Sequence, residues 1–173
     1  LLNKMINAAR LAPSAANLGP LEYVIVTKNN LMGKVFDCLR WAAYIHPQGI
    51  PPPGKQPVAY IAVLINTQKS KLSNYYGHDA GAAIENMLLT AQSFGIGSCW
   101  IGSIDRERLQ KILKIPKYCL IDSVVALGYP DETPKLEEFS GSVKYWKDKR
   151  GRLHVPKRRL KDIIHTNRFC LQI

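Results

Sequence analysis

The residue types that most often carry catalysis lie far apart in this sequence. Its four histidines are scattered, and His78 is adjacent to Asp79, so on a helix these two side chains point to different faces. The sequence contains no Gly-x-Ser-x-Gly motif, no P-loop, and no Gly-x-Gly-x-x-Gly motif after a predicted strand. We therefore expect no nucleophile and no acid–base pair supplied by the protein itself.

The cysteines give no indication of a metal site. They stand at positions 38, 99, 119 and 170, without a Cys-x-x-Cys pair and without histidines at zinc-binding spacing. Neither a signal peptide nor an N-x-Ser/Thr glycosylation site accompanies them. The sequence predicts reduced thiols, no bound metal and a cytoplasmic location.

Two segments have an unusual backbone character. In residues 12–17 (Ala-Pro-Ser-Ala-Ala-Asn), small side chains allow a flat ligand to approach the backbone, and Ser14 and Asn17 can pair with ring heteroatoms. In residues 95–103, Gly102 and Ser103 can present bare backbone N–H groups to an acceptor. Each pattern alone is also that of an ordinary turn, so the two together carry more weight than either.

Hydrophobic periodicity predicts the elements that must position these segments. An irregular proline-rich loop is expected over 46–57, either as a lid or as a plain surface connection. The order of elements favours helices layered on a sheet, whose strand directions the periodicity leaves open. The expected helices are 1–11, 31–43, 78–94, 106–113 and a short one near 159–164, and the expected strands are 21–27, 58–65, 98–101 and 120–127.

The net charge of +11 is unevenly distributed. Residues 1–134 carry 13 basic and 9 acidic side chains, whereas residues 135–173 carry 11 basic and 4 acidic ones. Such a segment indicates an anionic partner or simply a solvated surface. A nucleic acid is disfavoured because stacking aromatic residues are not interleaved with the basic ones, and no apolar run has the length of a membrane span.

Four stretches in this order resemble the FMN-dependent nitroreductase family. Residues 8–17, followed by Pro20 and a strand, look like the first family signature, and residues 79–102 look like the second. Residues 109–130 look like the third, and the tail over 143–167 is similar to that of a reductase-like branch. The resemblance covers nearly the whole chain.

The resemblance implies an α+β layered fold with a mostly antiparallel central sheet flanked by helices. It implies a single FMN-binding domain over 1–173, a homodimer, and a basic tail over 135–173 that wraps the partner subunit. NADH or NADPH would reduce FMN, which would then reduce a nitroaromatic, quinone or similar small acceptor in a ping-pong cycle. The implied flavin-binding residues are Pro13, Ser14, Ala15, Asn17, Trp100, Ile101, Gly102 and Ser103, with Lys135 at the phosphate and Trp41 and Tyr44 in a substrate lid.

One part of the family pattern has no counterpart here. The family's arginine-rich phosphate arm precedes the Ala-Pro-Ser signature, and this sequence, which begins at Leu1, lacks it. We expect that the N-terminal segment with this arm belongs to the protein and is not included in this sequence. The alternatives are a flavin-free or weakly flavin-binding relative with a binding role, and a specialised relative such as a reductive dehalogenase.

Overall fold

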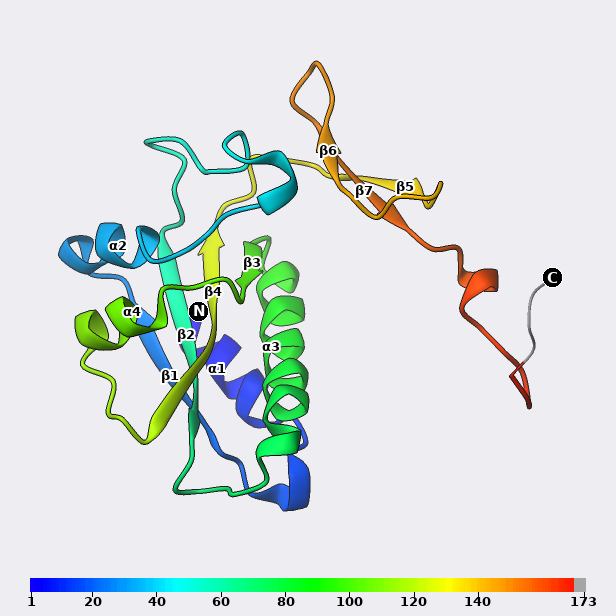
Figure 1. The fold of residues 1–173 in the computed structure, drawn as a ribbon. Helices are drawn as coiled ribbons and strands as arrows, with labels where there is room; N and C mark the ends of the chain where they lie inside the picture. Colours follow the sequence, from blue (N-terminus) through cyan, green and yellow to red (C-terminus); the bar gives the residue numbers. More distant parts are fainter. Residues whose placement is uncertain (170–173) are drawn as a thin grey trace. The chain divides into compact units, whose positions relative to one another are not determined.

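The computed structural model describes residues 1–169, which fall into two compact units (Figure 1). The first unit combines Leu1–Trp41 with Pro51–Pro130, and the second combines Ala42–Ile50 with the chain from Asp131 onward. In the described part of the chain, no helix is long and apolar enough to cross a membrane.

The first unit is built on a four-stranded sheet in the order β1-β2-β4-β3, and all neighbouring strands are antiparallel. β2 (Ala59–Asn66) is buried along its whole length, because it has a strand on each side and helices over both faces. The expected antiparallel sheet is therefore confirmed. The other three strands are β1 (Leu21–Val26), β4 (Cys119–Gly128) and β3 (Gly97–Ile101).

Two pairs of helices cover this sheet. α1 (Leu2–Arg10) and α3 (Tyr76–Ser93) pack together over one face, where Met5, Ile84 and Met87 are completely buried. The β2 side chains that point to the opposite face of the sheet are also buried. The second pair of helices covers that opposite face (Figure 1). These helices are α2 (Asn29–Phe36) and α4 (Arg106–Leu113).

The second predicted helix is seven residues too long. The sequence predicts it to residue 43, whereas α2 ends at Phe36. Beyond it the chain pairs with the loop ahead of α4: the backbone N–H of Arg40 donates to the Ser103 carbonyl, at 3.0 Å, and that of Asp105 donates to the Cys38 carbonyl, at 2.9 Å. Apolar residues that matched a helical period are therefore buried by long-range backbone pairing instead.

The second unit contains a sheet that the sequence analysis missed. Its strands are β5 (Lys135–Glu138), β6 (Trp146–Lys147) and β7 (Leu153–Lys157), in the order β5-β7-β6. They are short and rich in charged residues, so they give no clear alternation of apolar and polar positions. The short helix expected near 159–164 is only one 3₁₀ turn, at Leu160–Asp162.

A histidine between two carboxylates links these strands. Nδ1 of His154 lies 2.8 Å from Glu137 Oε1, and its Nε2 lies 3.3 Å from Asp148 Oδ2. The indole of Trp146 stacks on the imidazole with a centroid separation of 5.1 Å and an interplanar angle of 14°. This cluster ties all three strands and the β6–β7 turn together.

Acidification is expected to open the β6–β7 turn. Asp148 Oδ1 accepts the backbone N–H groups of Arg150 and Arg152, at 2.8 and 2.9 Å. The Arg152 N–H is the main cause that lowers the pKa of Asp148, and His154 and Arg150 add to it. A carboxyl group whose pKa is lower in the folded protein than in the unfolded chain stabilises the fold at every pH above its unfolded pKa, which is about 4 for Asp. This stabilisation is lost as the pH falls through the pKa of the folded state.

The measurement is the backbone amide NMR shifts of Arg150 and Arg152 across an acid titration. We expect both to move toward random-coil positions below about pH 4, while amides in β2 stay unchanged. Amides that moved at pH 6, or that stayed fixed through the whole acid range, would contradict this role for Asp148.

Candidate functional site

The loop after α1 adopts an unusual backbone conformation. Ala16 and Asn17 have φ values of 50° and 55°, in the left-handed region, and Gly19 follows at 53°. Outside glycine this conformation costs on the order of 1–2 kcal/mol per residue, so the surrounding structure must hold the loop in place.

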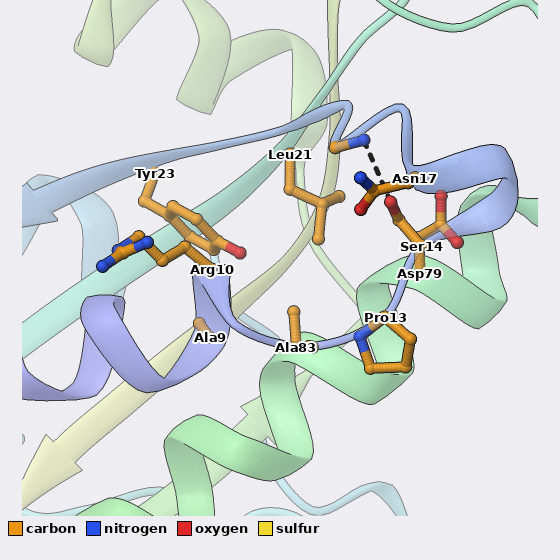
Figure 2. A pocket seen from close by; sticks show the side chains of 11 residues that line it. Ala9, Arg10, Pro13, Ser14, Asn17, Leu21, Tyr23, Asp79 and Ala83 are labelled. Atoms are coloured by element: carbon orange, nitrogen blue, oxygen red, sulfur yellow. Dashed lines mark hydrogen bonds between the residues drawn. The ribbon is translucent and has the colours of Figure 1, made fainter.

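Two side-chain contacts hold it. Asp79, in the first turn of α3, is 5% exposed and accepts the backbone N–H of Ala15 on Oδ1 at 2.8 Å. Within the loop, Ser14 Oγ accepts the backbone N–H of Gly19 at 3.0 Å, as Figure 2 shows. A buried carboxylate thus connects the loop to a helix that begins 59 residues after the loop ends.

A pocket of about 120 Å³ lies between the loop, α1, β1 and α3 (Figure 2). Tyr23 lines one end of the pocket. Burial, together with the neighbouring Glu22 carboxylate, raises the pKa of Tyr23 to about 12, and its hydroxyl is therefore protonated at neutral pH. The space suits one edge of a ring system, and a ligand of cofactor size would extend beyond it. The other residues that line it are Ala9, Arg10, Ala12, Pro13, Ser14, Asn17, Gly19, Leu21, Asp79 and Ala83.

The second segment lies where β3 leaves the sheet. β3 pairs with β4 as far as Ile101, and Gly102 and Ser103 then turn away toward α4. A Cβ atom built on Gly102 would meet nothing within 4 Å. Within residues 1–169, the backbone N–H groups of Gly102 and Ser103 donate to no protein acceptor. Two backbone donors therefore lack a protein partner, next to an open side-chain position at Gly102.

Arg106, in the first turn of α4, holds this turn. Its Nε donates to the Ile121 carbonyl at 2.9 Å, and its Nη2 donates to the carbonyls of Asp122 and Gly102 at 2.8 and 3.1 Å. Asp105, the N-cap of α4, accepts the backbone N–H of Arg108 on its carboxylate at 3.0 Å and so caps the helix.

α3 connects the two segments. Asp79 contacts the first loop, and two residues further on a Cβ atom at Gly81 would lie 3.8 Å from the Trp100 ring. Trp100 is 45% exposed, so part of this residue remains open to a ligand. The structure thus brings the two segments singled out in the sequence to the same half of one helix.

The remaining candidate residues have other surroundings. Trp41 is buried against Phe36, with ring centroids 5.2 Å apart, and no protein group in the described residues accepts its indole N–H. Tyr44 is 54% exposed and packs on Tyr145 in the second unit, at 4.9 Å. Lys135 Nζ lies 2.8 Å from Glu137 Oε1, also in that unit.

The described residues contain no assembled metal site, and their cysteines are free thiols. In residues 1–169, no group of three or more His, Cys, Asp and Glu side chains is arranged to hold a metal ion. Cys38 and Cys119 are buried free thiols and Cys99 is an exposed one. Cys170 lies outside the described residues.

The comparison with protein-family models decides the family. The nitroreductase family model matches residues 1–129, which is the larger part of the chain. This chain belongs to the nitroreductase family. The resemblance inferred from the sequence signatures is confirmed, and the family places the chain among the oxidoreductases.

Relatives of known sequence or structure agree with this assignment. A protein of Archaeoglobus fulgidus, whose name carries the words NADH dehydrogenase/NAD(P)H nitroreductase, is 34% identical over 139 residues, covering 76% of this chain and 73% of that protein. A Parabacteroides distasonis crystal structure named in the same words has a TM-score of 0.68 at 26% identity, covering 96% of this chain and 84% of that one. An FMN-dependent nitroreductase of Clostridium difficile has a TM-score of 0.67 at 22% identity, covering 97% and 87%, and shares the fold.

Sequence reasoning missed four residues of this region: Arg10, Tyr23, Asp79 and Arg106. Asp79 had a usable signal, because it lies on the same face of α3 as Ala80 and Ala83, which are buried. A carboxylate on an apolar helix face needs a partner, and here the partner is a distant backbone N–H. Arg106 had no such signal, since its acceptors are backbone carbonyls.

Proposed function

We propose that this nitroreductase-family protein is an FMN-dependent oxidoreductase that acts as a homodimer. The observation that carries the proposal is the pair of backbone N–H groups at Gly102 and Ser103, which have no protein acceptor in the described residues and directly follow the strand that carries the half-exposed Trp100. An isoalloxazine ring is flat, apolar at its faces and rich in acceptor atoms at its edge, so it matches this arrangement.

The residues present fit such a ring. At Gly102 there is no side chain to keep the ring from the backbone, and the N–H groups of Gly102 and Ser103 can donate to ring nitrogen or oxygen atoms. The loop Pro13–Asn17 has small side chains and a fixed conformation, which suits a second wall of the site. When bound, FMN supplies the redox chemistry, taking a hydride from NADH or NADPH and passing electrons on to a small acceptor.

This chain's residues would orient and enclose the ring. The donors at Gly102 and Ser103 would define its edge, Ile101 and Trp100 would pack along it, and the small residues of the first loop would approach it from the partner subunit. Lys135 is proposed to leave its ion pair with Glu137 and to contact the FMN phosphate, which carries a higher negative charge. No side chain in the site is required as a nucleophile, which agrees with the scattered histidines.

The homodimer is supported by apolar side chains left exposed in the second unit. Leu136 is 72% exposed, Leu160 69% and Ile164 58%, and a basic segment with such side chains suits contact with a partner subunit. We further propose that the protein acts in the cytoplasm, where free thiols remain reduced. The acceptor is proposed to be a nitroaromatic, a quinone or a similar small molecule.

The test is the visible absorption spectrum of the purified chain before and after addition of FMN. Flavin bands that persist through gel filtration and bleach with NADH or NADPH would support the proposal. A protein that stays colourless after incubation with FMN would overturn it. Gel filtration with light scattering would give the mass, and a monomer carrying FMN would contradict the proposed dimer.

The loop that carries Tyr44 is proposed to form a substrate lid together with Trp41. A Cβ atom at Gly49 would lie 2.4 Å from the Ala42 Cβ atom, so Gly49→Ala must displace this loop. We expect KM for the acceptor to rise several-fold while kcat changes less than about twofold, because a lid contributes to substrate binding. The measurement is steady-state kinetics with a quinone.

Gly33→Ala is the matched control, since a Cβ atom there would meet nothing within 4 Å. It should leave both constants unchanged. An unchanged KM in Gly49→Ala, with its far-ultraviolet spectrum showing a native fold, would exclude the lid.

A further inference from the structure

The end of β3 leaves part of the neighbouring strand without a partner. β3 pairs with β4 only as far as Ile101 opposite Val124, and beyond that point Ile121 and Asp122 have no strand on that side. The register between β2 and β4 also shifts here, between Ser123 and Ile121. Edge carbonyls of this kind need donors from elsewhere.

Arg106 supplies these donors. Its Nε and Nη2 atoms bond the carbonyls of Ile121 and Asp122 at 2.9 and 2.8 Å, so the planar guanidinium is fixed against the β4 backbone. The same Nη2 bonds the Gly102 carbonyl at 3.1 Å. Within residues 1–169 no carboxylate pairs with Arg106, so its positive charge is not compensated by an ion pair.

The Gly102 carbonyl and the Ser103 N–H belong to one peptide group. Resonance across a peptide bond couples the two ends, so a charged donor on the carbonyl oxygen increases the positive character of the N–H. The Ser103 N–H is one of the two bare donors of the site, and no protein acceptor competes for it in residues 1–169. The charge of Arg106 therefore reaches the ligand through a single peptide group.

We propose that Arg106 is a positioning residue for the flavin, because it holds and polarises the Gly102–Ser103 peptide group. The polarised Ser103 N–H then binds reduced FMN, which is richer in electrons, more tightly than it binds oxidised FMN. This inference rests on the proposed FMN site and concerns which oxidation state that site favours. A second, direct electrostatic contribution of the guanidinium acts in the same direction.

The test compares Arg106→Gln and Arg106→Lys with the unchanged chain. Glutamine keeps an N–H donor for the carbonyls but removes the charge, whereas lysine keeps the charge. Dissociation constants are measured for oxidised FMN by fluorescence quenching and for chemically reduced FMN under anaerobic conditions. We expect Arg106→Gln to reduce the preference for reduced over oxidised FMN about tenfold, and Arg106→Lys to retain most of it.

Arg108→Gln is the matched control, because Arg108 lies on the same helix and pairs with Asp37 at 3.6 Å without contacting Gly102. It should leave the preference unchanged. A second readout is the ¹⁵N–¹H signal of Ser103 in the flavin-free protein, which should shift upfield in Arg106→Gln and remain in place in Arg108→Gln.

Each outcome separates this inference from the proposed function. If the unchanged chain binds no FMN, the proposed function fails and this inference fails with it. If it binds FMN and Arg106→Gln weakens both oxidation states equally, or if Arg108→Gln has the same effect, only the role of Arg106 is overturned. If Arg106→Gln does not fold, Arg106→Lys decides. Because this variant keeps the charge, loss of its preference for reduced over oxidised FMN would also overturn the role of Arg106.

Discussion

Replacing Gly102 with valine is expected to abolish FMN binding and leave the fold intact. The position has open space where a side chain would begin: apart from the two neighbouring residues, no protein atom lies within 4 Å of a Cβ atom there, so a valine is expected to fit. A ligand that reaches the backbone N–H groups must occupy that same space. We expect FMN affinity to fall by at least about 100-fold, because a branched side chain would separate the ring from both donors.

Stability distinguishes a blocked site from a misfolded one. The free energy of unfolding should change by less than about 0.5 kcal/mol, as is typical of a substitution at an exposed position without special geometry. It is measured by urea denaturation, alongside the FMN titration. Gly33→Val, at another position with open space, provides the control and should bind FMN normally. Normal FMN binding by Gly102→Val would show that the ring lies elsewhere.

The sequence was most informative where local chemistry and long-range packing agree. The buried strand β2 and the amphipathic helix α3 were predicted because each satisfies its own local rule. The residues after Phe36 were predicted wrongly, since the backbone pairing of Cys38 and Arg40 with the loop ahead of α4 overrides the helical period. The sheet of the second unit was missed for a related reason: its short strands pair through backbone groups that sequence periodicity does not register.

In the candidate site too, some features were predicted from the sequence and others were not. The residue types in the two loops indicated a backbone-rich surface for a flat ligand, and the structure places both loops against α3. The supports of those loops were not predicted, because each is a side chain that bonds to distant backbone. Asp79 and Ala15 are 64 residues apart, and Arg106 reaches carbonyls 15 and 16 residues further along. Contacts of this kind depend on tertiary structure, which a single sequence does not encode in its spacing.

The support that matters most for the first loop is Asp79. Asp79→Ala removes the acceptor of the Ala15 N–H and leaves two residues in the left-handed region without an anchor. We expect the free energy of unfolding to fall by about 2 kcal/mol, which is the usual contribution of a hydrogen bond to a charged group. FMN affinity should fall at least about tenfold, because the loop would relax from the conformation that encloses the ring. Urea denaturation and FMN titration measure the two effects.

Asp79→Asn separates the hydrogen bond from the charge. Asparagine can still accept the Ala15 N–H on its side-chain oxygen and loses only the charge at the N-terminus of α3, which contributes about 0.3–1 kcal/mol. We therefore expect Asp79→Asn to recover most of the FMN affinity and most of the stability lost in Asp79→Ala. If the two variants lost FMN equally, the anchoring hydrogen bond would not be the function of Asp79, and its carboxylate charge would have to act on the cofactor directly.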